Sequence, residues 1–301
     1  MTRMFLIMAI VFSFFTSSIF AQTDSLKYQI EQVIATKKAH VGVSISAIEE
    51  KEDIRINNRS HFPLQSVFKL HIALTVLNEV DKGKLSLKQK ILIKKSDLLP
   101  ETWSPLREKY PAGNVEISLA EILQYTVSQS DNNGCDILVR LLGGIKKVSD
   151  YIHEIGINDF SIEANEEEMH QAWEVQFSNW TTPAAATELL KLFYKGKILS
   201  KKSFSFLWKI MSETSTGKER IKGQLPDKTL VAHKTGTSDT NGQGVTAAIN
   251  DIGIVTLPNG RHFAVSIFVS NSKENNQTNE KIIADISKLT WDYFISHANG
   301  N

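Results

Sequence analysis

Hydrophobic and polar positions follow two different patterns along this chain. In the segment 41–48 apolar and polar residues alternate, and this period of two predicts a β-strand. Strand patterns return late, in 246–257 and 262–270, on either side of Pro258-Asn259-Gly260, which predicts a hairpin. A sheet built from both ends of the chain is therefore expected, and the hairpin makes it antiparallel.

The middle of the chain, roughly 64–199, repeats apolar residues at helical spacing. Its clearest helices are predicted at 67–80, 119–127, 135–142, 145–155 and 183–194, and an amphipathic helix is predicted at 281–295. This order predicts an α/β (α+β) fold in which helices flank the sheet and an all-helical domain is inserted. We expect 22–63 and 220–301 to form the discontinuous α/β domain and 64–219 the inserted helical domain. A cleft between two such domains is a common place for a site.

The first residues have a different composition. One cation, Arg3, precedes an apolar run at 4–15, and small polar residues then lead to Ala21-Gln22. This layout predicts a secretory signal peptide, residues 1–21, cleaved after Ala21. An exported, periplasmic protein without stable membrane association after cleavage is expected. An uncleaved membrane anchor is the alternative.

Composition limits the possible partners and cofactors. Of the 301 residues 42% are hydrophobic and 22% are charged, and the net charge of +1 favours neither a nucleic acid nor an anionic membrane. Nothing argues against a monomer. Cys135, the only cysteine, excludes an intrachain disulfide, and its apolar surroundings predict a core residue. The eight histidines form no metal-binding pattern, so neither a metal site nor a cofactor is predicted.

Candidate chemistry starts at Ser66-Val67-Phe68-Lys69. Three residues separate the serine from the lysine, so one helical turn brings both side chains to the same face. A serine becomes a nucleophile when a nearby base takes its proton, and apolar surroundings and a second cation lower the pKa of a lysine. The pattern predicts that Lys69 activates Ser66. Alternatively, Ser66 only caps the helix and Lys69 extends to solvent.

Two more triplets follow in the chain. Ser130-Asp131-Asn132 precedes an apolar helix, and Lys234-Thr235-Gly236 precedes the hairpin. Alone, the first could be a turn and the second an edge strand protected by its lysine. Together with the first motif, they resemble the set that class A serine β-lactamases share with penicillin-binding proteins. The resemblance covers nearly the whole chain after residue 21. It implies a transpeptidase-like fold and hydrolysis of a small-molecule β-lactam through an acyl-enzyme.

The resemblance also implies roles for the motif residues. Ser130 would pass a proton to the leaving ring nitrogen, and Asn132 would bind the side-chain amide of the substrate. Lys234 and Thr235 would bind its carboxylate. Gly236 would let the ligand lie close to the strand backbone.

Two further elements are implied beside these motifs. The N–H groups of Ser66 and Thr237 would form the oxyanion hole. Arg220 would be a second cation near the substrate carboxylate, unless it is an ordinary surface arginine.

Deacylation requires a carboxylate that aims a water molecule. The family pattern E-x-x-L-N aligns with Glu166-Glu167-Glu168-Met169-His170, so Glu166 is the predicted general base and Glu167 and Glu168 are its competitors. His170 stands where an asparagine usually helps to hold the water, and its imidazole can also hydrogen-bond a water. A solvated acidic loop without catalytic role is the alternative for this run.

Some positions depart from the usual family pattern. Ala164 and Asn179 replace the arginine and aspartate of a loop-closing bridge, which resembles the PER/VEB-like extended-spectrum subgroup. Gln65 and Trp103 fit that subgroup, and Ser238 favours cephalosporins by the same resemblance. Trp103 is expected to wall the cleft, with core packing as the alternative.

His233, next to Lys234, is interpreted as a packing residue. Two other functions remain open at this point, because the three motifs do not distinguish a lactamase from its relatives. A D,D-peptidase would acylate on Ser66 and deacylate β-lactams very slowly. A non-catalytic β-lactam receptor domain would need a transmembrane connection, for which only the N-terminal apolar segment is available.

Overall fold

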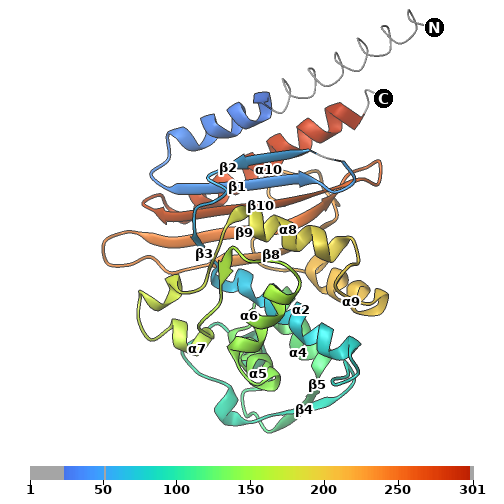
Figure 1. The fold of residues 1–301 in the computed structure, drawn as a ribbon. Helices are drawn as coiled ribbons and strands as arrows, with labels where there is room; N and C mark the ends of the chain where they lie inside the picture. Colours follow the sequence, from blue (N-terminus) through green and yellow to red (C-terminus); the bar gives the residue numbers. More distant parts are fainter. Residues whose placement is uncertain (1–23, 51, 299–301) are drawn as a thin grey trace, which may run out of the picture.

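The computed structural model describes residues 24–50 and 52–298, so the predicted signal peptide lies outside the described residues. A five-stranded antiparallel sheet with the order β2-β1-β10-β9-β8 lies across one end of the molecule (Figure 1). Its strands are β1 His40–Ala47, β2 Asp53–Ile56, β8 Val231–Thr237, β9 Thr246–Thr256 and β10 His262–Ser272. The predicted strands and the hairpin from both ends of the chain are therefore confirmed.

The sheet is covered on both faces, which explains why its central strands are apolar almost throughout. Along β10, Phe263, Val265, Ile267 and Val269 face a core formed with a helix at 24–35 and with α10 (Asn276–Ala298). Ala264 and Phe268 face the opposite core, which includes the helical part of the molecule. Alternate residues thus serve two different cores, as the pleat of a strand requires.

Most helices of the middle segment lie below the sheet in Figure 1, whereas α8 (Pro183–Tyr194) lies across the face of the sheet. The others are α2 Phe68–Asp81, α3 Pro105–Lys109, α4 Leu119–Ser128, α5 Asn132–Leu142, α6 Ile145–Glu154, α7 Glu166–Met169 and α9 Lys201–Ser212. Three 3₁₀ turns accompany them: η1 Gln65–Val67, η2 Lys95–Asp97 and η3 Val175–Phe177. Short strands form two small sheets, β3 Phe62–Pro63 with β7 Trp180–Thr181 and β6 Phe160–Ser161, and β4 Lys90–Ile93 with β5 Val115–Ser118.

All five helices predicted in the middle are confirmed, and α9 was not predicted. Helix α5 begins three residues earlier than its apolar pattern indicates. The cause is Asp131, whose side chain accepts the Gly134 N–H at 2.7 Å and caps the helix through a polar first turn.

Helix α2 is the central element of the helical part. Its first ten residues, 68–77, are all buried, as expected for a helix surrounded by others. Because η1 leads directly into α2, Ser66 and Lys69 stand at the end of this buried helix that approaches the sheet edge. Strand β8 occupies that edge. No helix among the described residues is long and apolar enough to cross a membrane.

Candidate active site

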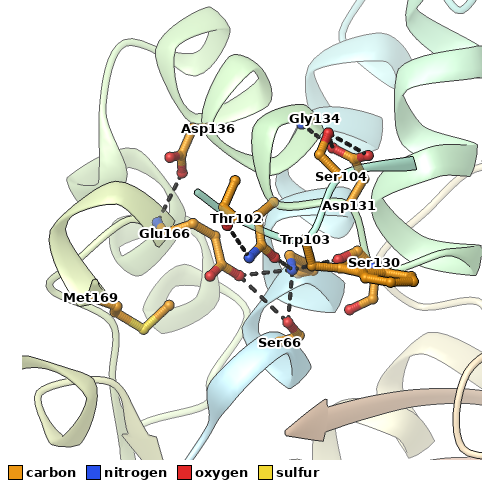
Figure 2. Close-up of polar contacts among 12 residues, drawn as sticks. Ser66, Thr102, Trp103, Ser104, Ser130, Asp131, Gly134, Asp136, Glu166 and Met169 are labelled. Carbon is orange, nitrogen blue, oxygen red and sulfur yellow. Dashed lines mark hydrogen bonds and ion pairs between the residues drawn. The ribbon is translucent and has the colours of Figure 1, made fainter. Parts of the chain in front are cut away.

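Ser66 and Lys69 do come together, as their spacing predicts. Lys69 Nζ lies 2.7 Å from Ser66 Oγ, and the Glu166 carboxylate lies 2.8 Å from the same nitrogen. Ser66 Oγ is 3.5 Å from Glu166 Oε1 (Figure 2). A hydroxyl, an amine and a carboxylate thus form one connected cluster at the start of α2. Such a cluster can move a proton between any two of its members.

The surroundings of Lys69 are polar rather than apolar. Besides Ser66 and Glu166, its amino group contacts the Ser130 carbonyl at 2.9 Å and Asn132 Oδ1 at 2.5 Å. These acceptors stabilise an ammonium group. The expectation of apolar surroundings for Lys69 is therefore wrong, while its role as the base that activates Ser66 stays a prediction.

Lys234 has the environment that the sequence suggested for Lys69. It is fully buried, and burial followed by the charge of Lys69 lowers its pKa well below the usual lysine value. Its Nζ donates to Ser130 Oγ at 2.9 Å, so the second and third motifs meet through this bond. Ser130 has a positive φ of 59°, an uncommon conformation for a residue other than glycine or asparagine.

Asp131 holds that turn in place. Its buried carboxylate accepts the Ser104 hydroxyl and the Leu106 N–H, in addition to the Gly134 N–H that caps α5 (Figure 2). These bonds tie the loop around Trp103 to the start of α5. The middle residue of the triplet is therefore a structural anchor.

Glu166 is positioned by a residue that the sequence did not single out. Asp136 of α5 accepts the backbone N–H of Glu166 at 2.9 Å and of Glu167 at 3.0 Å (Figure 2). These are the first N–H groups of α7, which have no partner within the helix. Burial raises the pKa of Asp136 to about 6. The two bonds hold α7 against α5, and the Glu166 side chain points toward Ser66.

The polar edge of the cleft is built around Arg220. Its guanidinium is 4% exposed, so it is not a surface arginine. It donates to the Gly236 and Asn250 carbonyls, each at 3.0 Å, and to Thr237 Oγ1 at 2.8 Å. Since this bond occupies a lone pair of the Thr237 oxygen, the hydroxyl proton of Thr237 is left for another acceptor. Thr235 is bonded similarly, with its Oγ1 2.6 Å from Thr216 Oγ1.

Besides the role that the resemblance implies for Gly236, to let the ligand lie close to the strand, this glycine also has a role in packing. A Cβ at this position would lie 2.6 Å from the Leu64 carbonyl oxygen. The absence of a side chain lets β8 pack against η1, and so brings the third motif next to Ser66.

The cleft in front of these groups has a volume of about 530 Å³. Of the predicted site residues, it is lined by Ser66, Trp103, Asn132, Glu166, His170, Thr237 and Ser238, together with Gln65. Trp103 is 57% exposed at its rim, which excludes the alternative of core packing.

Comparisons with known proteins agree with this geometry. A family model described as the beta-lactamase enzyme family matches residues 25–294. The chain belongs to this family. It is 51% identical to the beta-lactamase VEB-1 of Pseudomonas aeruginosa, over 96% of this chain and 98% of that protein. Identity to the extended-spectrum beta-lactamase PER-1 of the same organism is 44%, over 95% and 92%. A crystal structure of the TLA-1 extended-spectrum beta-lactamase superposes with a TM-score of 0.89 at 57% identity, covering 91% and 99%.

The chain is therefore a class A serine β-lactamase similar to VEB-1 and PER-1, and it hydrolyses β-lactams. This confirms the family, the fold and the subgroup predicted from the motifs. No three His, Cys, Asp or Glu side chains of residues 24–50 and 52–298 lie close enough to hold a metal ion.

In this β-lactamase, Asn179 closes the loop that carries Glu166 without any charged bridge. Its Oδ1 accepts the N–H groups of Glu163 and Ala164 at 2.8 and 3.0 Å, and its Nδ2 donates to the Ala164 carbonyl at 2.7 Å. Gln65 adds a second connection, because its Nε2 donates to Gln176 Oε1 at 2.7 Å. Amide groups thus replace the arginine–aspartate pair.

His170 and Ser238 both line the β-lactamase cleft. His170 Nδ1 contacts the carbonyl oxygen of Glu166, not its carboxylate, at 2.6 Å. Ser238 is tied to β9, since its hydroxyl accepts the Ala248 N–H at 2.9 Å.

Sequence reasoning missed three side chains that hold the site together: Asp136, Thr102 and Asp251. Thr102 Oγ1 accepts a hydrogen bond from Asn132 Nδ2 at 2.7 Å, and Asp251 is bonded to His233 at 2.9 Å. His233 is fully buried, as its interpretation as a packing residue requires, and its bond to Asp251 adds a polar contact. Cys135 is buried as predicted, and burial raises the pKa of its thiol well above the usual value.

Proposed function

We propose that this β-lactamase hydrolyses its substrates through an acyl-enzyme on Ser66, and that Glu166 drives the release of the product. The observation that carries the proposal is the cluster of Ser66, Lys69 and Glu166, whose reactive atoms lie 2.7 to 3.5 Å apart. This cluster opens onto a cleft of about 530 Å³.

Acylation begins when the Ser66 oxygen attacks the β-lactam carbonyl carbon. The Ser66 proton passes to Lys69 Nζ while Nζ passes a proton to Glu166, because both bonds already exist. The N–H groups of Ser66 and Thr237 stabilise the negative charge on the carbonyl oxygen. When the C–N bond breaks, the ring nitrogen takes the hydroxyl proton of Ser130, whose oxygen is bonded to Lys234. The proton held by Glu166 then returns through Lys69 to the Ser130 oxygen, so that Ser130 is a hydroxyl and Glu166 a carboxylate again before deacylation.

Substrate recognition uses the two polar sides of the cleft. Asn132 binds the side-chain amide of the substrate and is oriented by its bonds to Lys69 and Thr102. On the other side, Lys234 and the hydroxyl groups of Thr235 and Thr237 bind the substrate carboxylate. Arg220 contributes through its bond to Thr237. Gly236 supports this side by allowing β8 to lie against η1.

Deacylation uses the carboxylate of Glu166 as the general base. The carboxylate removes a proton from a water molecule, which attacks the ester carbonyl and releases the open-ring acid. His170 lies beside Glu166 and lines the same cleft, and its imidazole helps to hold that water. The buried position of Glu166 and the 2.8 Å contact of its carboxylate with Lys69 favour it over Glu167, which is exposed.

The substrates include extended-spectrum cephalosporins as well as penicillins. The named extended-spectrum enzymes PER-1 and TLA-1 support this breadth. The cleft supports it too, because a second cavity of about 400 Å³ adjoins it at Thr102 and His170. Trp103 and Ser238 border the space that a bulky substituent would fill.

The protein acts as a monomer and is exported to the periplasm, where it encounters its β-lactam substrates. Its site lies between an α/β domain, 22–63 and 220–301, and a helical domain, 64–219. Two cores on the two faces of the sheet support this division.

A time course with a chromogenic cephalosporin in large excess tests the proposal. Linear hydrolysis over many turnovers, equal with and without a chelator and abolished by Ser66→Ala, is the expected result. A single stoichiometric burst that leaves a covalent adduct would instead identify a D,D-peptidase or a β-lactam receptor.

A further inference from the structure

Gln65, the residue before Ser66, has an unfavourable backbone conformation. Its φ is +47°, in the left-handed range that residues other than glycine and asparagine seldom adopt. Among the described residues other than glycine, six have a positive φ, and the two of these that are buried are Gln65 and Ser130. Both lie at the active site. Such a conformation persists only where the surrounding structure enforces it.

The conformation of Gln65 matters for Ser66 because the two residues share one planar peptide group. The Ser66 N–H lies in that plane, so the backbone dihedrals of Gln65 set the direction in which this N–H points. In the proposed mechanism, the same N–H stabilises the negative charge on the carbonyl oxygen of the substrate. A donor of this kind must be aimed before the reaction begins, because its contribution depends on geometry.

Backbone hydrogen bonds restrain the chain on either side of Gln65. The Leu64 N–H donates to the Asn179 carbonyl at 2.8 Å, and the Phe68 N–H donates to the Gln65 carbonyl. This carbonyl belongs to the same peptide group as the Ser66 N–H, so the second bond partly holds that group. A further restraint comes from the side chain of Gln65.

That side chain is held by the loop that carries Glu166. Gln65 Nε2 donates to Gln176 Oε1 at 2.7 Å, and Gln176 Nε2 donates to the Trp173 carbonyl at 2.7 Å. Gln65 and Gln176 are only 8% and 7% exposed, so water is poorly placed to replace either bond. On the side of β8, a Cβ on Gly236 would lie 3.1 Å from the Gln65 Cβ. Gln65 is thus enclosed between the loop and the sheet edge.

We propose that Gln176 is a positioning residue for acylation: through its bond to Gln65 it keeps the Gln65 backbone at positive φ and so aims the Ser66 N–H at the oxyanion. The inference rests on the proposed function, because this N–H stabilises an oxyanion only if Ser66 attacks the substrate. It also gives the loop a second role, since the segment that holds Glu166 for deacylation then supports acylation as well.

Gln176→Met tests the proposal, because methionine has a similar length but offers the Gln65 amide only a weak acceptor. The acylation rate constant is measured by rapid mixing with a chromogenic cephalosporin. The affinity for phenylboronic acid is measured by competition with the same substrate. This acid forms a tetrahedral adduct with a serine hydroxyl, and one oxygen on its boron then occupies the position of the oxyanion.

Acylation by Gln176→Met is expected to be slower by about 10- to 100-fold, less than the roughly 10²- to 10³-fold loss that follows removal of a whole oxyanion-hole donor. The loss is partial because the Phe68 N–H still donates to the Gln65 carbonyl. Phenylboronic acid should bind more weakly by a similar factor, since its adduct uses the same donor.

Three further variants separate the aiming of the N–H from simple support of the loop. Gln176→Glu keeps an acceptor for the Gln65 amide and loses the bond to Trp173, so it should restore most of the acylation rate. Glycine adopts a positive φ without strain, so Gln176→Met should slow acylation no further in a Gln65→Gly background. Gln171→Met is the matched control and should acylate like wild type, because Gln171 lies on the same loop, is exposed and bonds Glu168 through its backbone N–H.

Three results would overturn the proposal: a folded Gln176→Met that acylates at the wild-type rate, a Gln176→Glu as slow as Gln176→Met, or an equal loss in the Gln65→Gly background. Circular dichroism establishes that each variant is folded, since lower stability alone does not change the acylation rate of folded molecules. If Gln176→Met does not fold, Gln65→Met removes the same bond from the other side and takes its place. If neither folds, the pair serves folding and the proposal is abandoned. A wild-type enzyme that forms no adduct on Ser66 would instead contradict the proposed function.

Discussion

Glu166→Gln separates the two halves of the proposed reaction. The change keeps the shape of the side chain and one oxygen near Lys69, but the amide cannot accept a proton from water. Acylation keeps the direct contact between Lys69 and the Ser66 hydroxyl at 2.7 Å, whereas deacylation depends fully on the Glu166 carboxylate. The variant is therefore expected to acylate and then to stop as a covalent adduct.

The size of the effect can be worked out from the contacts. A positioned general base contributes about 10²- to 10⁴-fold, so deacylation should slow by that factor. Lys69 loses its carboxylate partner at 2.8 Å but keeps three oxygen acceptors within 2.5 to 2.9 Å. The loss in unfolding free energy should then be roughly 1–3 kcal/mol, below the 3–5 kcal/mol of a buried charge left unpaired.

Rapid mixing with a chromogenic cephalosporin, followed by intact-mass measurement, tests this expectation. The variant should show a burst of one equivalent, a slow steady state and a mass increase equal to the substrate. Glu167→Gln is the control, because Glu167 is exposed and its bonds to Asp136 and His170 are made by its backbone. Rapid turnover by Glu166→Gln, or a trapped adduct with Glu167→Gln, would refute the assignment of the base.

Three further predictions concern the supports of the site. Asn179→Ala leaves buried N–H groups without acceptors, so calorimetry should show a loss of roughly 2–4 kcal/mol in unfolding free energy; an unchanged melting temperature would contradict this. Gly236→Ala puts a Cβ 2.6 Å from the Leu64 oxygen and should lower kcat/KM by about 10²-fold, whereas Gly242→Ala, with open space around it, should leave kcat/KM unchanged. Burial raises the pKa of Asp136 from 3.8 to about 6, so its cost to stability is absent below about pH 4 and complete above about pH 6. Relative to wild type, Asp136→Asn should therefore gain about 3 kcal/mol between these pH values in denaturant titrations, and a constant difference would count against it.

Much of the fold could be predicted because its signals are local. The alternation at 41–48 and the helical spacing at 67–80 arise because one side of each element faces a core. Each of these patterns repeats within a few residues, so it can be recognised in the local sequence. Helix α9 was missed, although its start is marked by Ser200, which caps the helix by accepting the Ser203 N–H. The two serines also donate to a distant residue, Asp81, and such a partner is not visible in a local pattern.

The site shows the same difference between local and distant information. Ser66 and Lys69 could be paired from their spacing alone, and Glu166 from its resemblance to a family motif. Asp136 could not be chosen among many carboxylates, because its role depends on α7 folding back onto α5. The polar environment of Lys69 was also unpredictable, since most of its oxygen partners come from segments more than 60 residues away.

The most direct test of the account is to find where the substrate becomes attached. Wild-type enzyme is quenched with acid during linear hydrolysis of a cephalosporin, digested and sequenced by tandem mass spectrometry. We expect one acyl group per molecule, on the Ser66 hydroxyl and on no other residue. An adduct on a different residue, or none while hydrolysis proceeds, would contradict it.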